Sequence, residues 1–193
     1  MPAWSWIVIA AVVVIAIAAV VFIALATIRR KRTERLKEHF GPEYERTVGE
    51  AGDERAAEKE LISRQRSRKK LDIVALSRES RGNYAERWRA VQTAFVDDPS
   101  GAVGEADRLV VEVMRERGYP VDDFDQRAAD ISVDHPDVVE HYRAAHTLHL
   151  AQEHGDIGTE AQREAFVHYR ALFEKLLEAE AETEKDTQKE ARA

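Results

Sequence analysis

The sequence predicts an all-α protein made of an N-terminal transmembrane helix, a polar helical stalk, and a C-terminal bundle of about four or five helices. Three observations favour this fold class. The chain starts with a long uncharged apolar segment, its second half carries apolar residues at helical spacing, and only one short stretch favours β-structure. That stretch runs from Leu71 to Leu76. Since one strand cannot make a sheet, we expect it to cross the bundle as an extended strap.

The apolar segment covers the 22 residues from Ile7 to Ile28, and Thr27 is its single polar residue. At about 1.5 Å per residue, such a helix can cross a hydrocarbon core of about 30 Å. A secretory signal peptide would instead carry positive charge before a shorter apolar core. We therefore expect residues 1–28 to form an uncleaved anchor.

Basic residues follow the apolar segment directly, and none precedes it. Because cytoplasmic flanks collect Lys and Arg, the N-terminus is expected outside and the rest of the chain in the cytoplasm. Tryptophan suits the membrane–water interface, since its indole N–H can stay hydrated. The predicted membrane-interface residues are Trp4, Trp6, Arg29, Arg30, Lys31, Arg32, Arg35 and Lys37.

Residues 29–71 are predicted to form a basic juxtamembrane segment and helical stalk. Gly41 and Pro42 mark a hinge. The helical sequence from Glu43 to Lys70 has few apolar residues, which predicts a solvent-exposed helix. The net charge is +5 for residues 29–70 and −12 for residues 71–193. The basic run from Arg64 to Lys70 lacks interleaved aromatic residues, so a solvated or leaflet-facing run is favoured over nucleic-acid binding.

Residues 72–180 are predicted to form the acidic bundle. Tyr84, Trp88, Val91 and Phe95 recur at helical spacing and mark a core-facing stripe. Asp98 followed by Pro99 is a helix start, which places an antiparallel helix after a short turn. The charged residues 181–193 are predicted to be a disordered tail.

No motif in this sequence indicates a known chemistry. Cysteine is absent, which excludes disulfides and Cys-based metal sites, and no phosphate-binding loop or nucleophile elbow occurs. His146 and His149 have the spacing of a helical metal pair, with His168 as a further ligand, but half-buried packing residues are the favoured reading. We predict no catalytic residue, cofactor or metal.

Aspartates crowd the connector between residues 118 and 136. An EF-hand starting at Asp123 would need glycine at its sixth position and glutamate at its twelfth, where Ala128 and Asp134 stand. Asp122 and Asp134 are predicted to cap helices. Asp123 and Asp130 are then left as a possible surface for a protein partner.

One resemblance adds to this reading. The stretches Phe95-Val-Asp-Asp-Pro, Ala106-Asp-Arg-Leu-Val-Val-Glu-Val-Met and Ser132-Val-Asp-His-Pro-Asp-Val-Val-Glu-His-Tyr-Arg resemble a family of uncharacterised, membrane-anchored bacterial proteins. The resemblance covers the anchor and residues 80–178, and it implies a bacterial cytoplasmic membrane and no catalytic residues.

The expected function is therefore a single-pass inner-membrane protein whose cytosolic helical domain serves as a protein-interaction or scaffold module. Its expected partners are the lipid bilayer and another protein, without nucleic acid or metal. The alternative is a membrane-linked enzyme or metal-dependent sensor that uses the His-bearing helix.

Overall fold

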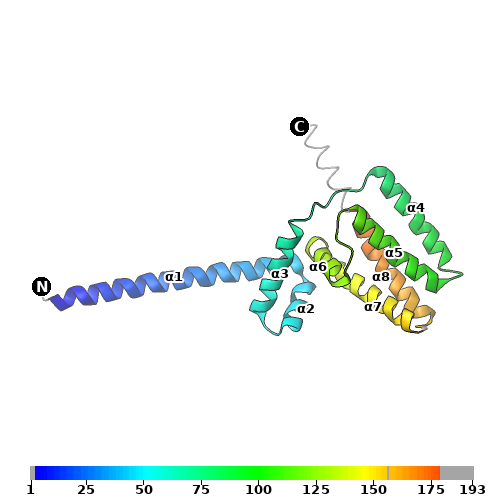
Figure 1. Ribbon diagram of the computed structural model, residues 1–193. Helices are drawn as coiled ribbons and strands as arrows, with labels where there is room; N and C mark the ends of the chain where they lie inside the picture. Colours follow the sequence, from blue (N-terminus) through cyan, green and yellow to red (C-terminus); the bar gives the residue numbers. More distant parts are fainter. Residues whose placement is uncertain (1–2, 156, 179–193) are drawn as a thin grey trace.

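The protein is all-helical in the part of the chain that the structure, a computed structural model, describes, namely residues 3–155 and 157–178. Eight α-helices and no strands occur there, which confirms the predicted all-α class. Helix α1 (Ala3–Phe40) extends away from the other seven helices, which gather around its C-terminal end (Figure 1). The predicted tail, residues 181–193, lies outside the described residues.

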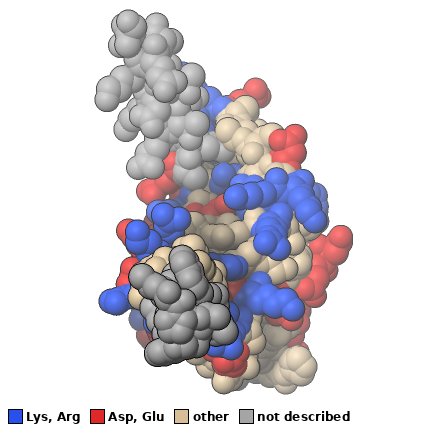
Figure 2. All heavy atoms as spheres, turned by 90° about the vertical axis from the view of Figure 1, so that its left-hand side faces the viewer, with Lys and Arg blue, Asp and Glu red and all other residues tan. Residues whose placement is uncertain are grey.

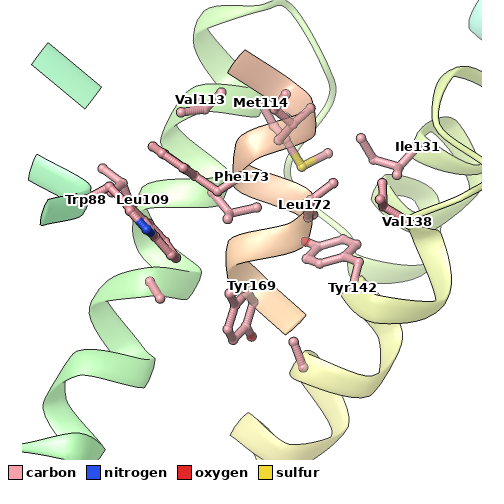
Figure 3. Close-up of a cluster of buried hydrophobic side chains, with 14 of the residues drawn as sticks. Trp88, Leu109, Val113, Met114, Ile131, Val138, Tyr142, Tyr169, Leu172 and Phe173 are labelled. Atoms are coloured by element: carbon pink, nitrogen blue, oxygen red, sulfur yellow. The ribbon is translucent and has the colours of Figure 1, made fainter. Parts of the chain in front are cut away.

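Five helices form the main bundle: α4 (Arg78–Ala94), α5 (Pro99–Glu116), α6 (Phe124–Asp134), α7 (Val139–His154) and α8 (Gly158–Glu178). Helix α8 packs against both α5 and α7, and α4 packs against α5. The core between them holds the side chains of Trp88, Leu109, Met114, Tyr142 and Leu172 (Figure 3). The predicted stripe on α4 is confirmed, because Tyr84, Trp88 and Val91 are buried and Phe95 packs partly buried against them.

Local signals explain where several of these helices begin. The Asp98 carboxylate accepts a hydrogen bond of 2.9 Å from the Gly101 N–H, and Pro99 occupies the first turn of α5, as predicted. Helix α4 is capped in the same way by Ser77. These caps satisfy backbone N–H groups that have no partner inside the helix.

The connector between α3 and α4 is an extended strap, in agreement with the reading of Leu71 to Leu76. The Val74 N–H donates to the Arg117 carbonyl at 2.9 Å, and Leu76 is buried in the main core. Gly118 has a φ of 94°, and a Cβ there would lie 2.5 Å from the Asp72 carbonyl oxygen. Glycine is therefore needed where the strap crosses the end of α5.

The segment predicted as a solvated stalk is instead folded. Helices α2 (Pro42–Ala51) and α3 (Glu54–Arg68) turn back at Gly41 and Gly52, both with positive φ, and pack against the end of α1. A second small core joins the three helices through Leu36, Phe40, Tyr44 and Leu61. These apolar residues are sparse along the chain, but the two turns bring them together, so the composition of each helix alone understates its burial.

The structure describes the helix of the apolar half of α1 but only part of its side chains. Within the described part of the chain, no helix combines the length and the apolar character needed to cross a bilayer. The side chains of residues 1–16 and of residue 18 are not among those described, so the predicted interface residues Trp4 and Trp6 lie outside them. The structure therefore does not show the predicted transmembrane helix.

Candidate membrane-facing surface

Basic side chains surround α1 where its apolar segment ends. Arg30 pairs with Glu34 at 3.0 Å, and Lys37 lies within 3.9 Å of Glu45 and 3.8 Å of Glu54. The other four predicted interface cations are exposed and make no ion pair with any described residue: Arg29, Lys31, Arg32 and Arg35. Their charges are available for an external partner.

Helix α3 adds a second row of cations beside this one. Arg55, Lys59, Ile62 and Arg66 follow each other at spacings of four, three and four residues, so they share one helical face. The three basic side chains are exposed and form no ion pair within the described residues, and Ile62 is partly buried. In the sequence, Arg66 stands out only as part of a charge run, and Arg55 and Lys59 were not predicted as surface cations although they lie four residues apart.

Two grooves lie between α1 and α3, and Arg32 and Ile62 line both. The first, called here the Arg66 groove, has a volume of about 470 Å³ and also includes Arg29, Thr33, Arg55 and Lys59. The second, called the Arg35 groove, has a volume of about 700 Å³ and also includes Ile28, Lys31, Leu36 and His39. Both volumes are in the range of small-ligand sites.

The view along α1 from its N-terminal side shows where these charges lie. Lys and Arg side chains gather on the face from which α1 projects (Figure 2). The groove residues on α1 and α3 belong to the same part of the molecule, because the Thr33 hydroxyl donates a hydrogen bond to the Glu58 carboxylate and so joins the two helices.

A buried ionic cluster holds α3 in this position. Glu43 of α2 has no exposed surface, and its carboxylate accepts hydrogen bonds from Arg46 at 2.9 Å, Arg64 of α3 at 2.7 Å and Arg143 of α7 at 3.1 Å. Burial alone would raise the pKa of Glu43. The hydrogen bond from Arg46 and the charges of Arg143, Arg46 and Arg64 together outweigh burial and lower the pKa below its usual value.

A second polar link joins the end of α3 to α6. Arg68 forms an ion pair with Asp134, and the same carboxylate accepts a hydrogen bond of 2.5 Å from the Tyr119 hydroxyl. Arg64 and Arg68 thus form ion pairs within the protein, whereas Arg66 between them lines the Arg66 groove. The basic run from Arg64 to Lys70 therefore divides into structural and solvent-facing residues.

The aspartate assignments in the connector need correction. Asp123, predicted to be non-capping, is the N-cap of α6 and accepts a hydrogen bond of 2.8 Å from the Gln126 N–H. Such a cap contributes about 1 kcal/mol. Asp122 is exposed and caps none of the described helices, and Asp134 lies at the end of α6 instead of starting α7.

Asp130 is only 1% exposed, which contradicts the predicted partner surface at this residue. Burial raises its pKa, and one carboxylate oxygen accepts a hydrogen bond of 3.0 Å from the Gln126 amide. Helix α6 lies between the main bundle and the small core. More of its surface is therefore buried than the sequence pattern predicts. A partner surface at the exposed Asp123 stays a prediction.

The histidines do not assemble as the metal hypothesis requires. His146 stacks on Phe124 with ring centroids 3.6 Å apart, which is the packing role favoured from the sequence. His168 lies instead against His141, with their Nδ1 atoms 2.7 Å apart. Residues 3–155 and 157–178 contain no group of three or more side chains arranged to hold a metal ion.

Comparisons with protein-family models, with curated proteins and with solved structures find no match for this chain. The family resemblance stated from the sequence therefore stays a prediction.

Proposed function

We propose that this protein is anchored in a bacterial cytoplasmic membrane by residues 7–28, and that its helical domain acts in the cytoplasm as an interaction or scaffold module. The observation that carries the proposal is the position of the cations that make no ion pair with any described residue. They surround α1 directly after its apolar segment, where the headgroups of a bilayer would lie.

The exposure of the second half of the apolar segment supports the anchor. Large apolar side chains there are between 51% and 73% exposed: Ile17, Val20, Val21, Phe22, Ile23, Leu25 and Ile28. No described helix covers them. A continuous exposed apolar surface of this kind is typical of a site that a membrane or another protein covers.

The charge distribution supports both the orientation and a protein partner. Residues 29–70 carry a net charge of +5 and face the proposed leaflet, whereas residues 71–193 carry −12 and are repelled by anionic headgroups.

The end of the bundle away from α1 has a depression of about 650 Å³ between the α4–α5 and α7–α8 turns, lined by Asp97, Asp98 and Glu153. Val96, which precedes Asp97 in the chain, is 82% exposed. An apolar residue with an acidic rim suits a partner segment that is both apolar and basic.

Membrane fractionation tests the anchor. We expect the full chain to stay with bacterial membranes after an alkaline carbonate wash, and residues 29–193 to be released, because only the full chain has the apolar segment. Protease added to intact spheroplasts should leave the helical domain uncut. Release of the full chain by carbonate would contradict the anchor, and external digestion of the domain would contradict the orientation.

In-cell photo-crosslinking tests the interaction module. A photoreactive amino acid in place of Val96 is expected to give a discrete protein adduct, whereas the same group in place of Val74, which is exposed on the strap, should not. Adding Asp97→Asn and Asp98→Ser should weaken the adduct at Val96, since the second change keeps a capping side chain. Equal labelling at both positions would show contact by chance and would argue against a specific surface.

A further inference from the structure

We propose that the Arg66 groove and the Arg35 groove bind the phosphate headgroup of an anionic phospholipid, so that α3 is a lipid-recognition helix lying on the leaflet. The inference rests on the proposed anchoring of residues 7–28. It adds a binding site with a defined ligand class, which anchoring by itself does not require.

The grooves lie at the depth of the headgroups. Ile28, the last residue of the apolar segment, lines the Arg35 groove, and Arg29, Arg32 and Thr33 line the Arg66 groove. A headgroup layer is about 5–8 Å thick on each side of the hydrocarbon core, which corresponds to about four or five residues of helix. The α1 residues from 28 to 33 therefore lie within that layer when the segment spans the bilayer.

The grooves have the chemistry of a phosphate site. Arginine presents a planar set of N–H donors that matches the oxygens of a phosphate, and Arg29, Arg32, Arg35 and Arg66 are free of ion pairs with described residues. Lys59 adds a mobile positive charge. The combined cations attract an anionic lipid over a zwitterionic one, because the latter carries its own positive group.

The acidic residues of the Arg66 groove are already engaged. Glu58 accepts hydrogen bonds from the Thr33 and Tyr44 hydroxyls, and Glu54 lies 3.8 Å from Lys37. Glu54 thus lies beside a cation within the protein, whereas the two hydroxyls bonded to Glu58 orient its carboxylate and leave its negative charge in place. The groove cations keep their positive charge for an external phosphate.

The groove walls also suit the remainder of a lipid. Ile28 and Leu36 of α1 and Ile62 of α3 give the Arg35 groove an apolar wall beside its cations. An apolar wall next to phosphate-binding cations fits the glycerol region and the first methylene groups of a lipid better than a free inorganic anion.

Photo-crosslinking in nanodiscs tests the site. The full chain is reconstituted in phosphatidylcholine containing a minor fraction of phosphatidylglycerol, with a photoreactive group near the headgroup of one lipid or the other. We expect the phosphatidylglycerol probe to label α3 peptides at least tenfold more than the phosphatidylcholine probe. The triple variant Arg55→Gln, Lys59→Gln, Arg66→Gln should lose about tenfold or more of that labelling, because each cation near an anionic surface contributes about fivefold to binding.

The matched control removes three cations from the bundle. Arg78→Gln, Arg89→Gln and Arg115→Gln change exposed residues of α4 and α5 that make no ion pair within the described part of the chain, and they lower the net charge equally. Labelling of α3 in this variant should be unchanged. An equal loss in both triple variants would show that net charge alone attracts the lipid and would overturn the site. The single variant Arg66→Gln, with circular dichroism matching that of the wild type, repeats the test with the smallest change.

Two further measurements separate the remaining outcomes. A phosphatidylcholine probe with the photoreactive group in its acyl chain should label residues 17–28 and so reports insertion of the anchor. Absence of that labelling overturns the proposed function and the inference with it, whereas a labelled anchor with unlabelled α3 overturns the inference alone. Excess inorganic phosphate at constant ionic strength should leave α3 labelling unchanged. A complete loss of α3 labelling under these conditions would identify a free phosphate, and not a lipid, as the ligand.

Discussion

Replacing Trp88 with alanine is expected to lower the free energy of unfolding by about 3 to 5 kcal/mol. Trp88 is 5% exposed, and its indole stacks on Phe166 and Phe173 of α8 with ring centroids 5.1 Å and 4.4 Å apart. Trp88 and Phe173 belong to the cluster of buried side chains in Figure 3. Alanine would remove these aromatic contacts and leave a cavity between α4 and α8. The loss is a large part of the 5 to 15 kcal/mol that typically stabilises a domain.

Trp88→Phe is the matched control for this change. The indole Nε1 is buried without a hydrogen-bond partner among the described residues, so phenylalanine loses no hydrogen bond and keeps an aromatic ring in the stack. We expect a cost below about 1.5 kcal/mol. Urea unfolding of the full chain in detergent, followed by circular dichroism, gives both values. A cost below about 0.5 kcal/mol for Trp88→Ala would be incompatible with a core position.

Replacing Glu43 with glutamine is expected to cost about 3 to 5 kcal/mol at neutral pH, because it removes the buried carboxylate that three partly buried arginines share. Glu43 has no exposed surface and contacts Arg46, Arg64 and Arg143 at once. The cost describes the broken cluster. It is not the net contribution of the intact ion pairs, which the desolvation of their charges largely offsets.

Glu140→Gln is the matched control, because Glu140 contacts two of the same arginines from a position where its side chain is 48% exposed. Solvent screens such a pair, so we expect a cost of about 1 kcal/mol or less. Urea unfolding of both variants under identical conditions compares a buried with an exposed carboxylate on one arginine cluster. Equal costs would show that Glu43 has no special role.

The pH dependence of the Glu43 effect follows from its lowered pKa. The folded-state pKa lies below the ordinary value of 4.5, so the unfolded chain takes up a proton more readily than the folded chain. The stabilisation by ionised Glu43 is complete above pH 4.5 and is lost as the pH falls through the lower folded-state pKa. The difference between wild type and Glu43→Gln should therefore be constant near neutral pH and shrink in acid.

The main bundle was predictable because its signals are local. Tyr84, Trp88 and Val91 show a helical period within a few residues, and Asp98 with Pro99 marks a helix start by its own hydrogen bonding. Such patterns depend on neighbouring residues only. The cysteine-free composition, the apolar start of the chain and the separation of basic from acidic halves are likewise properties of the sequence itself.

The burial of Asp130 comes from distant parts of the chain, whereas the cap at Asp123 is a local feature one residue away from the predicted one. Asp130 is buried because α6 is enclosed by both cores, and Asp123 caps α6 because the helix begins one residue later than Asp122 would require. A run of aspartates reveals neither the packing that buries Asp130 nor which of two neighbouring aspartates caps the helix.

The sequence by itself determined the helical class, the helices of the bundle, and the place along the chain where cations follow the apolar segment. Only the tertiary structure decided that residues 42–68 fold onto α1 and set Arg55, Lys59 and Arg66 beside Arg29 and Arg32. The physical reason is that burial of Glu43 depends on Arg143, which lies 100 residues away. From the sequence alone, a charged residue such as Glu43 is expected to be solvated. Its partner lies far away in the chain, so no local periodicity predicts its burial.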